Sequence, residues 1–164
     1  MDVFSHGLWG GIIFGRKNKR TFLITFLIGI APDILSFGPF FLMTLLGLND
    51  RSHFSGGPPD PALIPSYINQ LYNLTHSLVV FGIVFLILWA ILRKPFWLLL
   101  VWGFHILLDI FTHSFEFFPT PFLWPISDFK LDGWMWGSPW VYLTNVFLLI
   151  SLYLWFFIVR RRRA

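Results

Sequence analysis

Three ionisable residues interrupt an apolar stretch at residues 102–118, and their spacing suits the binding of a metal ion. His105, Asp109 and His113 recur every four residues in "WGFHILLDIFTHSFEFF". In a helix this spacing puts the side chains in one stripe, about 6 Å apart per step, so that neighbours can reach the same ion. Imidazole and carboxylate donors without sulfur suit Zn²⁺ first, with Mn²⁺ or Fe²⁺ as alternatives. The stretch therefore predicts one wall of a metal site.

Three other apolar segments carry a His or an Asp of the same kind. These are His6 in "SHGLWG", Asp33 in "GIAPDILSF" and His76 in "YNLTHSLVVF". A charged carboxylate near the centre of a bilayer costs on the order of 2.5–3.5 kcal/mol, which metal coordination offsets. The alternative is that these residues form only structural hydrogen bonds between helices. The candidate metal ligands are His6, Asp33, His76, His105, Asp109 and His113.

Several further polar residues have two interpretations. Thr75, Ser77 and Thr112 flank the candidate ligands and either orient them or bond back to their own helix carbonyls. His53 is expected to be a solvated loop residue. Four acids outside the apolar segments could fold over the site: Asp2, Glu116, Asp128 and Asp132.

The composition is that of a membrane protein. The chain has 164 residues, of which 56% are hydrophobic, 21% aromatic and only 12% charged, and its mean hydropathy is +0.70. A bilayer solvates such a surface, so we expect a single integral membrane domain over residues 1–164. The absence of cysteine excludes disulfides, thiolate ligands and a cysteine nucleophile. The opening residues lack the charged start and cleavage site of a secretory signal, so they are expected to belong to the mature chain.

Five apolar runs predict an all-α bundle of about five membrane helices. They cover residues 3–15, 21–48, 67–92, 95–114 and 139–159. The first run is short for a full crossing. Pro32 is expected to end a helix, because proline lacks the N–H that a helix interior needs. Residues 49–66 and 115–139 are rich in Gly, Pro or aromatics and are expected to be loops.

The basic residues orient the chain. Three clusters, at residues 16–20, 93–94 and 160–163, each lie beside an apolar run, which is the pattern of cytoplasmic loops and not of a nucleic-acid-binding face. Five crossings of an inner or plasma membrane then place the N-terminus outside and the C-terminus in the cytoplasm. On this topology the candidate ligands fall in the outer half of the membrane, where only Arg51 and Lys130 are outer cations.

Five short motifs resemble a known family, the membrane-bound metal-dependent hydrolases, also described as LexA-binding, inner-membrane-associated hydrolases. They are "SHGLWG", "APD", "THS", "HILLDIFTH" and "PFLWP", in the order of the family and over most of the chain. The resemblance implies a helical fold distantly similar to zinc-dependent phospholipases C and fungal zinc nucleases, which hydrolyse phosphate esters. It implies metal ligation by His6, Asp33, His76, His105 and Asp109.

The chain departs from the family at two positions. Many relatives carry an acid where this chain has Leu35, and a His where it has Leu71. His113 is the candidate to replace a missing ligand.

Two functions follow from these residues. The first is hydrolysis of a phosphate ester, such as a lipid phosphate, by metal-activated water, with Asp33 or Asp109 accepting the proton. The second is a non-enzymatic scaffold or an ion- or proton-handling protein that uses the same His and Asp residues structurally. A conduit should carry ionisable groups from one side of the membrane to the other, and the inner half of each predicted segment has none.

Overall fold

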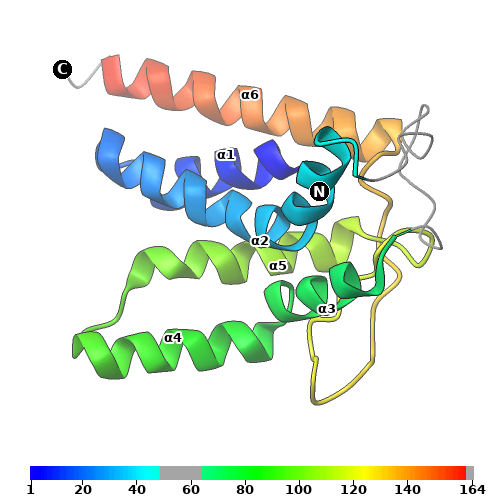
Figure 1. The fold of residues 1–164 in the computed structure, drawn as a ribbon. Coiled ribbons are helices and arrows are strands. Elements are labelled where there is room, and N and C mark those ends of the chain that lie inside the picture. Colours follow the sequence, from blue (N-terminus) through cyan, green and yellow to red (C-terminus); the bar gives the residue numbers. More distant parts are fainter. Residues whose placement is uncertain (49–63, 162–164) are drawn as a thin grey trace.

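The computed structural model describes residues 1–48 and 64–161, and this part of the chain is helical. Its six α-helices are α1 (Val3–Phe14), α2 (Lys19–Leu45), α3 (Ser66–Thr75), α4 (Leu78–Leu92), α5 (Leu100–Thr112) and α6 (Pro139–Arg161). A 3₁₀ turn, η3 (Trp97–Leu99), precedes α5 (Figure 1). The all-α class predicted from the sequence is confirmed. His53, Arg51, Asp50 and Asp60 lie outside the described residues.

The helices run back and forth between two ends of the molecule. In Figure 1, α6 lies beside α1 on one side of the bundle and α4 and α5 lie on the other, with α2 between them. The α1–α2 turn, the α4–α5 turn and the C-terminal end of α6 all lie at the left-hand end of that view. The loop that follows α5 lies at the opposite end.

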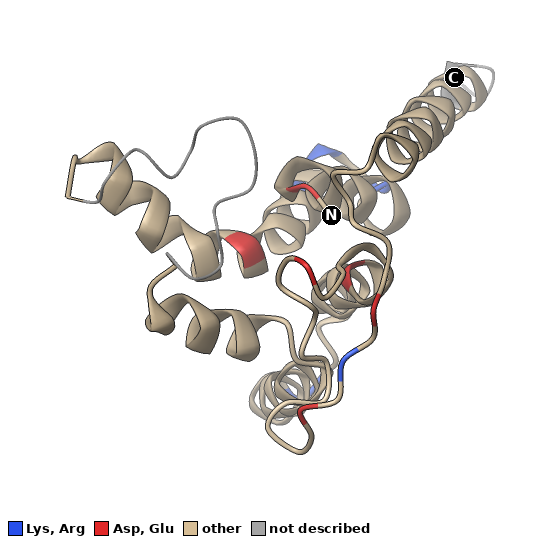
Figure 2. Cartoon of the chain, turned by 90° about the vertical axis from the view of Figure 1, so that its right-hand side faces the viewer, with Lys and Arg blue, Asp and Glu red and all other residues tan. Residues whose placement is uncertain are grey.

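This arrangement places the clusters of basic residues at one end of the molecule and most of the described acidic residues at the other. Arg16, Lys17 and Lys19 lie at the α1–α2 turn, and Arg93 and Lys94 follow α4. Figure 2 looks onto the opposite end, where acidic residues gather around the loop after α5. The basic clusters thus share one end, as the positive-inside pattern requires. Which end faces the cytoplasm stays a prediction.

Fewer helices than expected are long enough to cross a membrane. Within the described residues, α2 and α6 are long and apolar enough, and a third span exists if α3 and α4 count as one helix with a 56° bend. The 12-residue α1 rises only about 18 Å, against a hydrocarbon core of about 30 Å. Five apolar runs therefore do not give five full-length spans.

The predicted helix end at Pro32 is wrong, because α2 continues through both Pro32 and Pro39. A proline inside a membrane helix is tolerated where neighbouring groups bond to the backbone that it disturbs. Pro32 removes the helical hydrogen bond to the carbonyl of Ile28. The next carbonyl, that of Gly29, accepts a hydrogen bond from His105 Nδ1 at 2.7 Å, so a side chain of α5 contacts the turn of α2 before Pro32.

The expectation of one helix over residues 67–92 is also wrong, since this run breaks at His76 and Ser77. The Ser77 side chain caps α4 by accepting hydrogen bonds from the N–H groups of Val79 (3.1 Å) and Val80 (3.2 Å). A serine cap satisfies N–H groups that would otherwise lack a partner at a helix start. The break places His76 between two helices.

Glycines let α1 approach α2 closely. A Cβ on Gly29 would lie 2.7 Å from the carbonyl oxygen of His6 and 3.1 Å from Gly7 Cα. No side chain other than hydrogen fits between the two backbones. This contact fixes His6 on α1 close to the turn of α2 that carries Asp33.

A chain of hydrogen bonds ties α6 to α1. Trp9 Nε1 donates to Asn145 Oδ1 at 2.8 Å, and Asn145 Nδ2 donates to Ser5 Oγ at 2.7 Å. The Tyr153 hydroxyl donates to the carbonyl of Leu8 at 2.9 Å. These bonds attach the otherwise largely apolar α6 to the helix that carries His6.

Candidate metal centre

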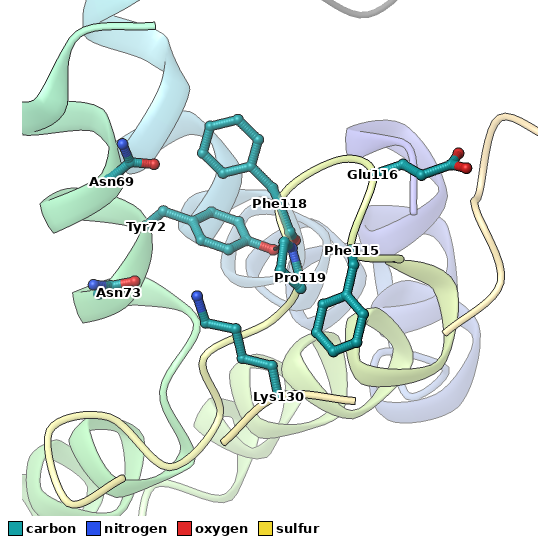
Figure 3. A pocket seen from close by; sticks show the side chains of 8 residues that line it. All are labelled: Asn69, Tyr72, Asn73, Phe115, Glu116, Phe118, Pro119 and Lys130. Carbon is teal, nitrogen blue, oxygen red and sulfur yellow. Dashed lines mark hydrogen bonds between the residues drawn. The ribbon is translucent and has the colours of Figure 1, made fainter. Parts of the chain in front are cut away.

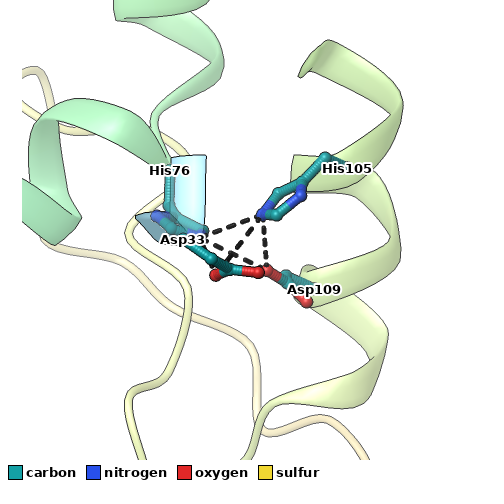
Figure 4. A group of neighbouring side chains, drawn as sticks. All are labelled: Asp33, His76, His105 and Asp109. Carbon is teal, nitrogen blue, oxygen red and sulfur yellow. Dashed lines mark hydrogen bonds and ion pairs between the residues drawn. The ribbon is translucent and has the colours of Figure 1, made fainter. Parts of the chain in front are cut away.

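Four buried side chains from three parts of the fold meet at one point. Asp33 comes from α2, His76 from the α3–α4 break, and His105 and Asp109 from successive turns of α5 (Figure 4). One ligand atom of each lies within 4.8 Å of all the others. The group could therefore hold a metal ion.

The nitrogen and oxygen atoms converge at short distances. His76 Nε2 lies 3.1 Å from His105 Nε2, and Asp109 Oδ2 lies 3.4 and 3.2 Å from these two nitrogens. Asp33 Oδ1 lies 3.3 Å from His76 Nε2 and 3.8 Å from His105 Nε2. Two imidazoles and two carboxylates thus surround a common centre.

The outer nitrogen of each imidazole fixes its tautomer. His105 Nδ1 faces the carbonyl of Gly29, which can only accept, so this nitrogen carries the proton of the neutral ring. His76 Nδ1 lies 2.9 Å from Thr75 Oγ1 and 3.3 Å from the carbonyl of Tyr72, and the Thr75 hydroxyl itself donates to the carbonyl of Leu71. Both Nε2 atoms therefore direct lone pairs at the common centre.

Neutral rings in these tautomers cannot hydrogen-bond each other through Nε2, and the carboxylates offer no proton either. Asp33 Oδ2 and Asp109 Oδ2 are buried without a hydrogen-bond partner. Four facing lone-pair donors need a cation between them, which is either a metal ion or protons on the imidazoles. The donor set of two His and two Asp without sulfur suits Zn²⁺, Mn²⁺ or Fe²⁺.

The second oxygen of Asp109 faces a different set of partners. Asp109 Oδ1 lies 2.9 Å from His6 Nε2, 3.4 Å from His113 Nε2 and 2.5 Å from the N-terminal ammonium of Met1. That ammonium also lies 3.0 Å from His113 Nε2. Asp109 therefore stands between the four-residue group and a second cluster of nitrogens.

His6 and His113 lie beside the four-residue group and not within it. The His6 ring stacks on His105 with a centroid distance of 3.7 Å, and neither of its nitrogens forms a hydrogen bond. His113 lies just past the end of α5 in an extended conformation, so the predicted helical stripe holds for His105 and Asp109 only. Ligation by His6 and His113 stays a prediction.

The hydroxyl groups of Thr75 and Thr112 both bond back to a carbonyl of their own helix and lie near a residue of the four-residue group. Thr75 Oγ1 both donates to the carbonyl of Leu71 and contacts His76 Nδ1, each at 2.9 Å. Thr112 Oγ1 donates to the carbonyl of Leu108 at 2.9 Å and lies 3.5 Å from Asp109 Oδ1. Ser77 caps α4 and donates to the carbonyl of Trp124. Only Thr75 thus directly contacts an imidazole of the group.

Asp2, Asp128 and Asp132, which could have folded over the site, do not belong to the four-residue group. Asp2 caps α1 by accepting from the N–H of Ser5 at 3.0 Å, and Asp132 accepts from the N–H of Phe115 at 2.9 Å. Asp128 lies in the loop after α5, outside the four-residue group. Leu35 is 60% exposed, so its side chain is not part of the buried centre.

Tyr72 is a site residue that the sequence did not indicate as one. Its ring stacks on His76 with a centroid distance of 3.9 Å. Its hydroxyl lies 3.0 Å from His113 Nδ1 and donates to the carbonyl of Phe118 at 3.0 Å. The four-residue interval between Tyr72 and His76 on a helical run was the only signal for it.

A small polar cavity of about 160 Å³ is lined in part by Tyr72, whose ring stacks on His76. Figure 3 shows the side chains of Asn69, Asn73 and Lys130 at this cavity, with the Glu116 carboxylate turned away from the Lys130 ammonium. The cavity thus offers one cation and two amides.

The chain was compared with protein-family models, with curated proteins and with solved structures. No family model, curated protein or solved structure matches it.

Proposed function

We propose that this chain is a membrane-bound, metal-dependent hydrolase that cleaves a phosphate ester, with a lipid phosphate as substrate. The observation that carries the proposal is the convergence of two imidazole lone pairs and two carboxylates at one buried centre. Burying such groups is costly unless a cation occupies the centre. The resemblance of five motifs to the membrane-bound metal-dependent hydrolases supports the same activity.

The chemistry needs a bound metal and a proton acceptor. A divalent ion at this centre would supply an acidified water molecule and would polarise a phosphoryl oxygen. Asp33 Oδ2 is the acceptor in the proposal, because it is buried without a partner while the Asp33 side chain keeps 8% exposure. As water adds to phosphorus, Asp33 would take up its proton, and the ester P–O bond would break with its electrons on the leaving oxygen, which would gain a proton from solvent and depart as the alcohol.

The surroundings of the centre support an anionic substrate held at the membrane. Lys130 lies at the polar cavity beside Tyr72, where its ammonium can bind a phosphate oxygen. Asp33 of the centre lies on α2, which is one of the helices long and apolar enough to cross a membrane, and this supports a substrate held at the membrane. A lipid phosphate combines the anionic group and the apolar surroundings.

The deciding experiment is elemental analysis of the purified protein, followed by hydrolysis assays on 4-nitrophenyl phosphate and phosphatidic acid. We expect at least one equivalent of a divalent metal in the wild type and in Asp132→Asn, and loss of both metal and turnover in Asp109→Asn. Asp132 is the matched control, because its carboxylate accepts a hydrogen bond from the N–H of Phe115 in a loop. A wild-type protein without stoichiometric metal would overturn the proposal and favour the structural alternative.

A further inference from the structure

A large apolar groove lies between α5 and α6. Its volume is about 520 Å³, within the range of about 300–1,000 Å³ typical of small-molecule sites. One wall is a stripe of α5, including Phe104, Leu108 and Phe111, and the other is a stripe of α6, including Val141, Thr144 and Leu148. Within the described residues α1 packs against both helices, whereas α5 and α6 make few contacts with each other. The groove is the space left between α5 and α6, because both pack against α1 and hardly against each other.

Two residues that line the groove also lie close to Asp109, a residue of the candidate metal centre. Met1 and Thr112 both line it. The Met1 ammonium lies 2.5 Å from Asp109 Oδ1, and Thr112 Oγ1 lies 3.5 Å from the same oxygen. Two lining residues of the groove are thus in contact with a carboxylate of the centre.

The outer side of the groove is open toward lipid. Trp134 and Trp140 line it and are 75% and 82% exposed. Leu148, at the far end on α6, is 44% exposed and belongs to a candidate membrane span. A molecule can therefore enter from the bilayer without crossing water.

The lining offers little to a polar occupant. None of its side chains carries a charge, and Asn145 is already bonded to Trp9 and Ser5. The groove has apolar walls, and the Met1 ammonium and Asp109 lie beside one end of it. A molecule with a hydrocarbon chain and an anionic head group matches this combination. Ordinary lipid solvation of a helix face would not require a groove whose lining residues contact Asp109.

We propose that this groove binds the acyl chain of the substrate and so positions its phosphate at the His/Asp centre. The proposal rests on the hydrolase function above and names its substrate class as a long-chain lipid phosphate. Positioning matters because a displacement of a reacting group by about 1 Å can cost about 10²-fold in rate.

The test compares two substitutions of the same type on α6. Leu148→Trp fills the groove, whereas Leu143→Trp places the same ring on an exposed position outside it. For each protein the readout is kcat/KM for palmitoyl lysophosphatidic acid divided by kcat/KM for 4-nitrophenyl phosphate. We expect this ratio to fall at least about tenfold in Leu148→Trp and to stay within about twofold in Leu143→Trp. An unchanged ratio in Leu148→Trp would overturn the proposal.

A binding measurement separates this proposal from the proposed function. Native mass spectrometry should detect lysophosphatidic acid bound to the wild type and to Leu143→Trp, with at least about tenfold less bound to Leu148→Trp. If the wild type binds the lipid in this pattern but hydrolyses neither ester, the hydrolase function fails and the groove stands. Equal lipid binding by all three proteins, or a dimer that Leu148→Trp dissociates, would show that the groove is not an acyl-chain site.

Discussion

Asp33 and Asp109 differ in how many of their oxygens lie close to nitrogen atoms of other residues. Asp109 uses Oδ2 toward His76 and His105, and Oδ1 toward His6, His113 and Met1. Asp33 uses Oδ1 alone, and its Oδ2 has no partner. On the proposed function Asp109 is therefore an anchor of the centre, and Asp33 is the residue free to exchange a proton.

Replacing Asp33 by an isosteric amide should separate the two roles. Asp33→Asn keeps an oxygen that can face the metal but cannot accept a proton at neutral pH. We expect metal content close to that of the wild type and a kcat lowered by about 10²–10⁴-fold, the usual contribution of a general base. Elemental analysis and turnover of 4-nitrophenyl phosphate measure the two quantities. Wild-type turnover in this variant would remove Asp33 as the proton acceptor.

Tyr72 should contribute to stability through its hydroxyl group. Tyr72→Phe keeps the ring that stacks on His76 but removes the hydroxyl between His113 Nδ1 and the Phe118 carbonyl. Loss of a buried hydrogen bond should lower the free energy of unfolding by about 1 kcal/mol, or Tm by about 2–4 °C for a chain of this size. Thermal unfolding in detergent measures the shift. Tyr142→Phe, on the exposed side of α6, should leave Tm unchanged.

At the scale of helices, the close contact of α1 with α2 positions the centre. The backbone of α1 at His6 and Gly7 lies against Gly29 of α2, one turn from Asp33. The carbonyl of Gly29 also accepts the hydrogen bond from His105. One small residue thus lies at the junction of α1, α2 and α5.

A methyl group at this junction should separate the helices. Gly29→Ala would place Cβ 2.7 Å from a backbone carbonyl that cannot move alone, so we expect a loss of about 1–3 kcal/mol and a Tm several degrees lower. Gly82→Ala is the matched control, because nothing lies within 4 Å of its Cβ. There the higher helix propensity of alanine should leave Tm unchanged or raise it. Equal Tm values for the two variants would contradict this account of the α1–α2 contact.

Helical spacing correctly predicted part of the site, whereas the expected positions of helix ends were wrong. The four-residue interval of His105 and Asp109 placed them on one face of α5, and their atoms lie 3.2 Å apart. The proline rule failed at Pro32, since α2 continues through this residue and through Pro39. The break at His76 depends on the cap that Ser77 provides, which competes with continuation of an apolar helix. Apolar spacing alone thus did not show where this run breaks, because a single capping serine ends one helix and begins the next.

At the scale of the whole molecule, the two ends differ in charge. The α1–α2 and α4–α5 turns are basic and lie at the same end, and the acidic loop after α5 lies at the other (Figures 1 and 2). This separation was predictable because positive clusters at alternate connections mark one side of a membrane. The number of full-length spans was not, because hydropathy does not show where an apolar run bends.

Labelling of single cysteines should place the two ends on opposite sides of the membrane. The chain has no cysteine, so an introduced thiol is unique. We expect a membrane-impermeant maleimide to label Ile126→Cys, which replaces a 78% exposed side chain, in intact cells. Lys17→Cys should react only after permeabilisation. Labelling of both variants in intact cells would show that the two ends of the molecule do not lie on opposite sides of the membrane.

If α6 crosses the membrane, as its length and hydropathy suggest, its attachment to α1 links the centre mechanically to the bilayer. Asn145 is bonded to Trp9 and to Ser5, the residue next to His6. A membrane helix tilts when the thickness of the surrounding hydrocarbon changes. If α6 tilts, it must either carry the turn of α1 that holds His6 or break these two hydrogen bonds. Bilayer thickness can thus alter the distance between His6 and Asp109.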